Sequence, residues 1–482
     1  MRQPRPIPAA ATTTAAASTA ISRRRMLGLT TAAGAALPLL SACGSAELQP
    51  LPKPPENAAY PLAKAEEFFK SLEWPTTDVA EPTGPTTVTL AITASEDAEI
   101  RHQQFAYFFR ELHPTIEIKR EVTSFGDYLT KYLTSAAGGS LPDLMYCHYS
   151  WAQNLIKNGV LAPIDSYIAK TPEFKLDDFS EQAYSYWVRD GEHFGIPSDS
   201  APKMLFYNKE IFDRAGIEPP GESWTWDHLY RVAAELTSGS GVNKVYGYTA
   251  MPQMKADLTP VHLLPYGGRF LSEDERSVQV QEQPAYDALA PWVELQVKHQ
   301  AVPSLAEMQA LEDADPFRTN HAAMSVNGLW IVPALQRLQG KDKFDWAVTH
   351  VPKGPAGRFS PLVGSAYGIT SKARNPEAAW IVLNALMSPA GQRYFNLTPP
   401  ARLSTFEQNL ADLQLPKEIA EVGKAAITDY AGSDGVLRGV GTKKVEDTAK
   451  VTWDEVRAGA MPLADGLAKI NTELTPILQE AG

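Results

Sequence analysis

The sequence has few cysteines and no long hydrophobic run. Only Cys43 and Cys147 occur in 482 residues. A membrane-spanning helix needs about 20 predominantly apolar residues. The best candidate runs from Met26 to Leu40, which is too short and is diluted with Ala, Gly and Thr. No second apolar segment reaches that length, so the sequence predicts a body without membrane spans.

Recognisable catalytic motifs are also missing. The nine histidines form no H-x-x-x-H or H-E-x-x-H pair, and the sequence contains neither a phosphate-binding G-x-x-x-x-G-K-[ST] loop nor a G-x-S-x-G nucleophile elbow. We therefore expect no metal site, no cofactor and no catalytic residues. Acidic residues are numerous, and a carboxylate pair for glycoside hydrolysis leaves no sequence signature. An exported polysaccharide-active enzyme thus remains the alternative to a binding protein.

The first 42 residues differ in charge from the rest of the chain. They contain five arginines and no acid, so removing them lowers the formal charge from −12 to −17. Such an acidic body is not expected to bind nucleic acid or to adhere broadly to anionic lipid.

The segment RRRMLGLTTAAGAALPLLSACGS (23–45) has the order of an export signal: a basic region, a short apolar region and small residues. The paired Arg23 and Arg24 resemble a twin-arginine signal. Leu40-Ser41-Ala42-Cys43 resembles a lipobox, in which Cys43 becomes the lipidated first residue of the mature protein. The alternative is a plain secretory signal with an incidental cysteine, against which the order and distance of the two motifs argue. With Cys43 lipidated, only Cys147 remains, so no intrachain disulfide can form and a large core must stabilise the protein.

Two sequence patterns organise the body. Residues 46–86 are rich in proline, with one helical candidate from Leu62 to Trp74, and are predicted to form an extended tether. From residue 86, alternating strands such as TTVTLAIT (86–93) are followed by helical patterns such as Phe125 to Ala137. Strands that alternate with helices predict an α/β fold with mainly parallel sheets.

Ten tryptophans are the most informative aromatic residues. Sugar rings present an apolar C–H face and a rim of hydroxyls, which aromatic side chains beside polar groups match. Trp151 and Trp330 follow strand-like runs at turns and are predicted to lie in a binding cleft. Core positions are predicted for Trp187, Trp292, Trp346 and Trp380.

The order of several segments resembles the extracellular solute-binding proteins of ABC importers, in the branch that contains the maltodextrin-binding proteins. The segments are LPDLMYCHYSWAQNLIKNGVLAPIDSYI (141–168), GIPSDSAPKMLFYNKEIFDRAGIEPPGESWTWDHL (195–229), GGRF (267–270), AAMSVNGLWIV (322–332) and WAVTHVPKGPAGRFSPLVGSAYGITSKARNPEAAWIVLNALMS (346–388). The most specific parts are Tyr207-Asn208-Lys209 and the Gly328-x-Trp330 turn. The resemblance covers about residues 86–480.

This resemblance implies a periplasmic-binding-protein-like (type II) fold of two α/β lobes joined by a three-crossing hinge. The implied domains are a signal peptide (1–42), a lipid-anchored tether (43–85), lobe one (86–200 plus 366–428) and lobe two (202–362 plus 434–482). The crossings are expected near Asp199–Met204, Pro361–Tyr367 and Ile427–Gly435.

The implied function is capture of a carbohydrate-like solute, a mono- or oligosaccharide, by hinge closure and its delivery to an ABC permease. The protein would be an exported monomer, lipid-anchored at the outer face of the cytoplasmic membrane or in the periplasm. The identity of the solute stays open, and a polyol or a glycerophosphodiester is among the alternatives. A phosphorylated ligand would call for cleft cations, for which Lys203, Lys255 and Arg438 are available.

The resemblance also implies ligand contacts, which are carried over to the segments of this sequence that match the family. Cys147 stands where the maltodextrin binders have a cleft aromatic residue, which argues against maltodextrin itself. Trp330 matches the stacking tryptophan of the family best. The full set of ligand-binding residues that the resemblance implies is Ser95, Glu96, Asp97, Ser150, Trp151, Asp199, Asp257, Trp330, Gly364, Ser365 and Tyr367.

Overall fold

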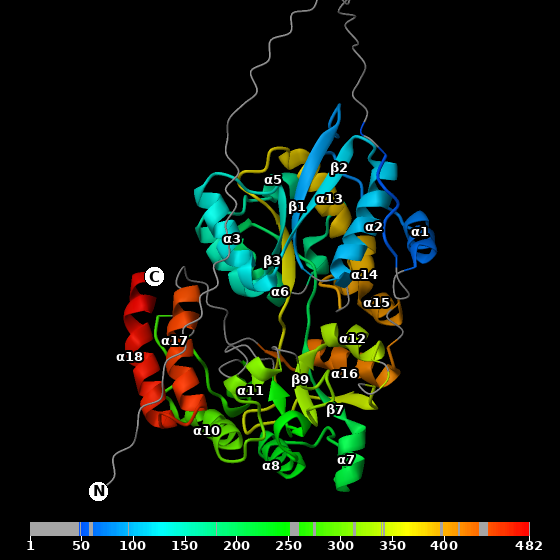
Figure 1. Cartoon of the computed structure of the whole chain (residues 1–482). Helices are drawn as coiled ribbons and strands as arrows, with labels where there is room; N and C mark the ends of the chain where they lie inside the picture. Colours follow the sequence, from blue (N-terminus) through cyan, green and yellow to red (C-terminus); the bar gives the residue numbers. More distant parts are fainter. Residues whose placement is uncertain are drawn as a thin grey trace, which may run out of the picture. The chain divides into compact units, whose positions relative to one another are not determined.

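The computed structural model divides the chain into Met1–Ser45 and Ala46–Gly482, and all described residues belong to the second unit (Figure 1). Cys43, Arg23 and Arg24 therefore lie outside the described residues. No helix within the described part combines the length and apolar character of a membrane span. The structure describes residues 48, 50–56, 61–94, 96–179, 181–250, 260–272, 276–311, 315–338, 340, 343–395, 399–412, 415–432 and 442–481.

The first lobe is built on a five-stranded sheet in the order β2-β1-β3-β12-β6. Strands β1, β2 and β3 run parallel, whereas β12 is antiparallel to both β3 and β6. The predicted strand 86–93 is confirmed as β1 to the residue. The strands are β1 (Thr86–Thr93), β2 (Ile116–Thr123), β3 (Leu144–His148), β6 (Ile196–Pro197) and β12 (Ser365–Ile369), beside a small hairpin of β4 (Val188–Arg189) and β5 (Glu192–His193).

Helices cover both faces of this sheet (Figure 1). Val88, Leu90 and Ile92 of β1 pack into one core with Phe105 and Phe109. The opposite face packs into a second core with α3 and α4. The helices of this lobe are α1 (Leu62–Lys70), α2 (Glu96–Leu112), α3 (Phe125–Ala137), α4 (Ala152–Lys157), α5 (Asp165–Ile168), α6 (Glu181–Ser185), α13 (Pro376–Leu386), α14 (Pro389–Phe395) and α15 (Phe406–Asp412).

The second lobe is built on a four-stranded sheet in the order β10-β7-β9-β8. Only β8 and β9 pair in parallel, so both sheets are mixed where mainly parallel sheets were expected. Strands that enter a sheet directly from the other lobe need no crossover helix, and they can run antiparallel to their neighbours. These strands are β7 (Lys203–Asn208), β8 (Thr249–Ala250), β9 (Met324–Gly328) and β10 (Trp346–Thr349).

Two cores also lie on the faces of this sheet. The larger contains α8, α10, α17 and α18, and the smaller contains residues of α12 and α16. Trp187, Trp292 and Trp380 are buried as predicted, and Trp346 is partly buried. The helices of this lobe are α7 (Lys209–Ala215), α8 (Trp226–Leu236), α9 (Pro260–Leu263), α10 (Gln283–Val297), α11 (Leu305–Ala310), α12 (Val332–Gln336), α16 (Lys417–Thr428), α17 (Thr442–Arg457) and α18 (Leu463–Ala481).

Two extended segments, 198–202 and 362–364, carry the chain between the lobes and lie side by side. Ala201 N–H donates to Val363 O at 2.7 Å, and Val363 N–H donates to Ala201 O at 3.1 Å. The segments join β6 to β7 and β11 (Ser360–Pro361) to β12. Beside them, β11 pairs in parallel with β13 (Ala431–Gly432). These positions match the first two expected crossings.

The third crossing differs from the expected one near Ile427–Gly435. Ile419 and Val422 of α16 pack with Met204 and Phe206 of the second lobe, although 366–428 was assigned to lobe one. The α15 helix contacts α14 of the first lobe. The chain therefore changes lobes between α15 and α16. The sequence pattern identified an amphipathic helix here but did not specify which sheet it covers.

Part of the expected tether is integrated into the first lobe. Leu62 and Phe69 of α1 are buried, and the Phe69 ring stacks on Phe108 at 4.9 Å. The hydroxyls of Thr77 and Thr171 are 2.8 Å apart, and Trp380 Nε1–H donates to Thr171 at 3.0 Å. Residues 61–79 thus pack on the lobe, so any free tether must precede them.

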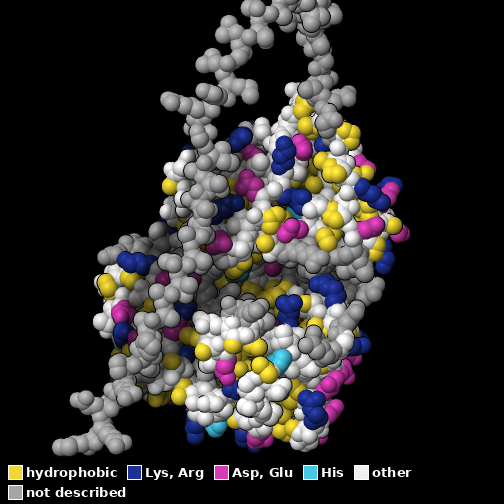
Figure 2. Space-filling view, in the orientation of Figure 1, with side chains coloured by type: hydrophobic (Ala, Val, Ile, Leu, Met, Phe, Trp, Pro, Cys, Tyr) yellow, Lys and Arg dark blue, Asp and Glu magenta, His cyan; other side chains and the backbone are white. Residues whose placement is uncertain are grey.

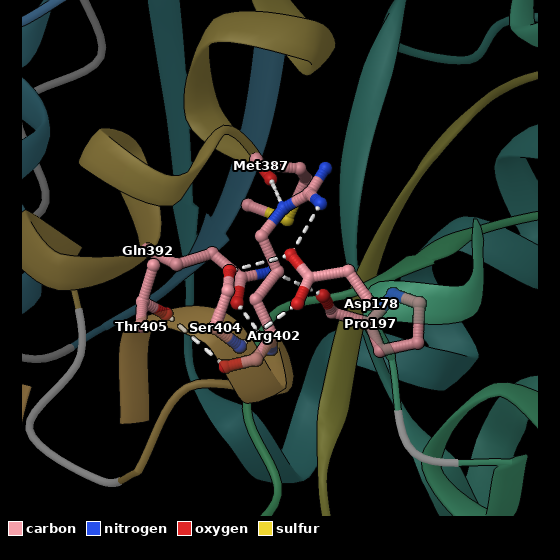
Figure 3. Close-up of polar contacts among 7 residues, drawn as sticks. All are labelled: Asp178, Pro197, Met387, Gln392, Arg402, Ser404 and Thr405. Carbon is pink, nitrogen blue, oxygen red and sulfur yellow. Dashed lines mark hydrogen bonds and ion pairs between the residues drawn. The ribbon is translucent and has the colours of Figure 1, made fainter. Parts of the chain in front are cut away.

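A buried ion pair holds the first crossing in place on the lobe-one side (Figure 3). Arg402 is 3 % exposed, and its Nη1–H donates to Asp178 Oδ2 at 3.0 Å. Its Nε–H donates to Met387 O at 2.7 Å, and its backbone N–H donates to Gln392 Oε1 at 2.9 Å. Gln392 Nε2–H in turn donates to Pro197 O at 2.6 Å. The cluster therefore connects α14 and the segment before α15 to the last residue of β6.

Replacing Arg402 with Met should lower the free energy of unfolding by about 3–5 kcal/mol, because Asp178 would keep a buried charge without its cation. The matched control is Arg393→Met, which breaks the more exposed pair with Asp412 and should cost about 0–1 kcal/mol. Denaturant unfolding of both variants measures the difference. Equal losses would show that burial does not set the strength of the Arg402 pair.

A histidine lies in the aromatic core of the second lobe. His262 is 1 % exposed and packs against Trp226, with ring centroids 4.7 Å apart. Its Nδ1 is 3.2 Å from Tyr230 Oη. Burial lowers the pKa of His262 to about 3, so the folded protein holds this ring neutral. The unfolded chain protonates it near pH 6.5.

We expect His262 to destabilise the fold in acid. The stability that the fold has with His262 neutral is fully present above pH 6.5. It is lost as the pH falls toward the folded pKa of about 3, at roughly 1.4 kcal/mol per pH unit, because only the unfolded chain binds the proton. Unfolding measured between pH 6 and pH 4.5 should show a shallower loss for His262→Phe than for the unchanged protein. The exposed His299→Gln serves as control and should leave the slope unchanged. Parallel slopes for all three proteins would contradict the prediction.

Candidate functional site

The carboxyl ends of β1, β2 and β3 are the natural ligand-binding edge of the first sheet, because ligands of open α/β sheets bind outside the carboxyl ends of their strands. Ser95, which follows β1, lies outside the described residues. Glu96 and Asp97 begin α2, and their side chains are not described. Residues Ser124–Phe125 follow β2, and a 3₁₀ turn, Tyr149–Trp151, follows β3.

Aromatic rings from these turns form a cluster with a buried and an exposed side. Trp151 is 7 % exposed and stacks on Tyr128, with centroids 5.4 Å apart and planes at 13°. Phe125 is 38 % exposed, and its ring centroid lies 4.7 Å from that of Trp151 and 5.2 Å from that of His148. The predicted cleft residue Trp151 is therefore part of the lobe-one core in this structure, with Phe125 against it.

Ser150 and Cys147 have local roles. Ser150 Oγ and His148 Nδ1 are 2.9 Å apart, so the serine fixes the half-buried imidazole. Cys147 is fully buried in the core shared with α3 and α4, and burial raises the pKa of its thiol. Its side chain belongs to the packed interior, although its position in the sequence matches a cleft aromatic residue of the maltodextrin binders.

A polar group occupies the start of the first crossing. Asp199 Oδ1 accepts hydrogen bonds from Ser198 Oγ at 2.8 Å and from the Ser365 backbone N–H at 2.9 Å. The hydroxyl oxygens of Ser365 and Tyr146 are 2.6 Å apart. Burial, and then the nearby Asp199 carboxylate, raise the pKa of Tyr146. Asp199 and Ser365, both predicted site residues, are thus brought together although they are far apart in the sequence.

Tyr367, another predicted site residue, faces a buried histidine. The Nδ1 of His102 is 2.6 Å from Ala98 O, which can only accept, and its Nε2 is 3.0 Å from Tyr367 Oη. Burial lowers the pKa of His102 to about 4, so the ring is neutral near pH 7. Nδ1–H therefore donates to Ala98, and Nε2 accepts from the Tyr367 hydroxyl. The Tyr367 hydroxyl is thus directed at His102 inside lobe one, and the Tyr367 ring packs edge-on against Tyr146, with centroids 5.9 Å apart.

Gly364 is required by a close backbone approach. A Cβ at this position would lie 2.4 Å from Asp199 O, which is closer than atoms of two packed residues approach. Gly364 O also accepts a hydrogen bond from Tyr149 N–H at 3.0 Å. The glycine therefore allows the second crossing to pass between the first crossing and the turn after β3.

Trp330 lies at the corresponding edge of the second sheet. It is half-buried in a short 3₁₀ turn, Leu329–Ile331, directly after β9. Its ring occupies the space that a side chain at residue 328 would take, since a Cβ on Gly328 would be 1.8 Å from the ring. Lys203, the cross-strand partner of Gly328, places its Nζ 4.4 Å from the ring centroid. Asp257, the other predicted site residue of this lobe, lies outside the described residues.

The turn that carries Trp330 is supported from behind. Gly328 N–H donates to Asn327 Oδ1 at 2.9 Å, and Asn327 Nδ2–H donates to Asp315 Oδ2 at 3.2 Å. Burial raises the pKa of Asp315, although hydrogen bonds from Phe317 and the charge of Arg318 oppose the shift. This chain of contacts fixes the turn independently of the indole ring.

Three aromatic residues at the edges were not among the predicted ligand contacts: Phe125, His148 and Tyr149. The sequence feature that could have identified them is their position at the last residue of a strand or just after it.

Within the described part of the chain, no three His, Cys, Asp or Glu side chains gather as a metal site. Figure 2 shows basic and acidic side chains interspersed on the visible face, without one large basic patch. The groups brought together at the crossings are hydroxyls, a carboxylate and aromatic rings, which bind by hydrogen bonds and stacking.

Comparison with known proteins identifies the fold. A putative binding protein of Brucella abortus is 24 % identical over 318 residues, which are 62 % of this chain and 74 % of that protein. An ABC substrate-binding protein from Listeria monocytogenes, solved with cycloalternan, aligns with a TM-score of 0.73 at 23 % identity over 82 % of this chain and 99 % of the other. The GacH receptor of Streptomyces glaucescens, solved unliganded and with acarbose, aligns with a TM-score of 0.69 at 23 % identity over 83 % and 100 %.

These likenesses confirm the expected fold of two α/β lobes of the periplasmic-binding type. The family model of the bacterial extracellular solute-binding proteins matches residues 91–393, which include the first two crossings and all strands of both sheets except the first part of β1. Members of this family are binding proteins that capture solutes outside the cytoplasm for ABC importers. The chain belongs to the bacterial extracellular solute-binding protein family.

Proposed function

We propose that this protein is the substrate-binding lipoprotein of an ABC importer and that its ligand is a carbohydrate. The observation that carries the proposal is the placement of aromatic side chains at the ligand-binding edges of both sheets, beside hydroxyl and carboxylate groups at the crossings. Trp330 comes from the second lobe and Phe125 from the first, while Asp199, Ser365 and Tyr146 lie at the crossings.

Carbohydrate fits this set of groups better than most small solutes. A sugar ring can place its C–H face against an indole or phenyl ring and its hydroxyls against hydrogen-bonding groups. Trp330 and Phe125 offer partly exposed rings for stacking. The Listeria and Streptomyces proteins of the same fold were solved with the saccharide ligands cycloalternan and acarbose, which supports the proposal by analogy.

Binding would proceed by closure of the two lobes about the crossings. Hinge closure is the established motion of periplasmic binding proteins, and it is absorbed by a few residues at the ends of elements. The paired segments 198–202 and 362–364 are such positions, and the contacts of Asp199 with Ser198 and Ser365 are made there. A ligand that contacts both lobes would favour the closed state, which the permease then recognises.

Export and anchoring complete the proposal. The order of Arg23-Arg24, the apolar stretch and Cys43 supports twin-arginine export followed by lipidation. The anchored segment would precede Pro54 and Pro55, where the chain already packs on lobe one: Pro54 is buried and Pro55 O accepts from Gln104 Nε2–H at 3.0 Å. The protein would then be held at the outer face of the cytoplasmic membrane as a monomer that presents solute to its permease.

Replacing Trp330 with Ala should weaken binding of the best saccharide by about 2 kcal/mol or more, as expected for a central aromatic anchor. The ligand-free unfolding midpoint should change little, because the ring is partly exposed. Phe125→Ala should behave in the same way. Calorimetry on the saccharide selected by a thermal-shift screen gives the affinity, and incubation with labelled glycan should leave the glycan uncleaved.

Trp151→Ala is the comparison variant, for which we expect a loss of stability in place of a loss of affinity. Because Trp151 is buried against Tyr128, its truncation should cost about 3–5 kcal/mol of stability. Retained affinity in Trp330→Ala, or an affinity loss in Trp151→Ala without a loss of stability, would contradict this arrangement. Cleavage of the glycan would favour the enzyme alternative.

Replacing Cys43 with Ala should block processing at that site and lipidation, so the variant should no longer partition into detergent as the unchanged protein does. Detergent phase partitioning of cells that express each form measures the change. Cys147→Ala is the control and should still partition with detergent, since Cys147 is buried in the core. Unaltered partitioning of Cys43→Ala would show that another feature holds the protein to the membrane.

A further inference from the structure

The last residue of β9 is a glycine whose backbone conformation does not require glycine. Gly328 has φ −107° and ψ 169°, which is extended geometry that any residue adopts. Glycine inside a strand costs stability relative to alanine, because it loses more conformational freedom on folding. Where a strand keeps a glycine, a ligand or another group often approaches the backbone closely. The reason for glycine at this position therefore lies in what packs against it.

The group that packs against Gly328 is the Trp330 ring. A Cβ on Gly328 would lie 1.8 Å from Cζ3 of the indole, and 2.2 and 2.3 Å from Cε3 and Cη2, the two carbons bonded to Cζ3. These short and nearly equal distances place the Cβ over the face of the six-membered ring, since a Cβ beside the ring edge would be farther from both flanking carbons. Because carbon atoms pack at about 3.5–4.0 Å, a methyl group here would push the indole away by roughly 1.5–2 Å.

The backbone on both sides of Trp330 is held in place. Gly328 N–H donates to Asn327 Oδ1 at 2.9 Å, and Asn327 is itself buried. Leu329 and Ile331, the two neighbours of Trp330, are 1 % and 5 % exposed, whereas Trp330 is half-buried. A side chain at residue 328 would therefore displace the indole and leave the turn where it is.

We propose that Gly328 is a positioning residue for solute binding, because it lets the Trp330 indole rest on the strand in one orientation and at one depth. The sugar ring then stacks on the part of the indole that Gly328 does not cover. A ring that is already ordered loses less rotamer freedom when the ligand binds, so Gly328 increases affinity without touching the ligand. This inference rests on the proposed carbohydrate function and adds to it a residue outside the predicted ligand contacts.

A double-mutant cycle of Gly328→Ala and Trp330→Ala tests this role. Calorimetry uses maltotriose, cellotriose, xylotriose and mannotriose as probes, and the comparison is made on the probe that the unchanged protein binds most tightly. Trp330→Ala should weaken binding about thirtyfold and Gly328→Ala about tenfold. The double variant should bind as Trp330→Ala does, because no ring is left for the methyl group to displace.

The midpoint of thermal unfolding gives a second measurement that needs no ligand. In the Trp330→Ala background, Gly328→Ala should raise the midpoint, because alanine suits an extended backbone better than glycine. With the ring present it should not raise the midpoint, since the methyl group and the indole compete for the same space. Gly84→Ala is the control: a Cβ there would have no atom within 4 Å, so affinity should be unchanged.

The outcomes separate this inference from the proposed function. Unchanged affinity in Gly328→Ala, beside a loss in Trp330→Ala, overturns the positioning role and leaves the carbohydrate function intact. Additive losses in the double variant also overturn it, because the methyl group would then act without the indole. So does a midpoint that rises equally in both backgrounds. If no probe binds the unchanged protein, or if Trp330→Ala binds as tightly as the unchanged protein, the proposed arrangement of the site fails and the positioning role fails with it.

Discussion

The hydrogen-bonded pair of crossings is the constraint on which both lobes depend. Segment 198–202 joins β6 of one sheet to β7 of the other, and segment 362–364 joins β11 to β12. Ala201 and Val363 bond reciprocally between the two segments. Gly364 permits their close approach, because any Cβ there would meet Asp199 O at 2.4 Å. Since Asp199 also accepts the Ser365 N–H, the groups that define the hinge are the groups proposed to contact solute.

Each end of the first crossing is held by its own lobe. On the lobe-one side, the Arg402 cluster connects Pro197 with α14, and Arg402 is paired with Asp178 inside the protein. On the lobe-two side, Ser360 binds both the N–H and the carbonyl of Lys203. We therefore expect the rotation of lobe closure to fall on residues between these supports, and solute contacts there to change with it.

Local patterns predicted local structure well. Alternation of Val88, Leu90 and Ile92 specified β1, and the helix from Phe125 to Ala137 is α3 as predicted. Both patterns arise from side chains that one element buries on one face, so the information lies within the element. Assigning α16 to a lobe required information from outside the helix, because an amphipathic helix has the same pattern whichever sheet it covers.

The same limit applies to the proposed site. Trp330 and Trp151 both follow a strand at a turn, and their sequence surroundings predicted the same role for both. In the structure α3 packs over Trp151, so Tyr128 stacks on it, whereas Trp330 lies over a glycine and is only half-buried. Phe125, which the sequence marked only as the first residue of a helix, is the more exposed ring of the lobe-one cluster.

By itself, the sequence determined the fold class, the acidic body without recognisable catalytic motifs, and the family. These properties follow from composition, from periodicity within single elements and from the order of segments along the chain. Tertiary structure alone decided which aromatic rings stay accessible, which sheet α16 covers and that Lys203 lies on the Trp330 ring. Each of these depends on contacts between residues far apart in the sequence, such as Lys203 with Gly328 and Asp199 with Ser365, which no local pattern encodes.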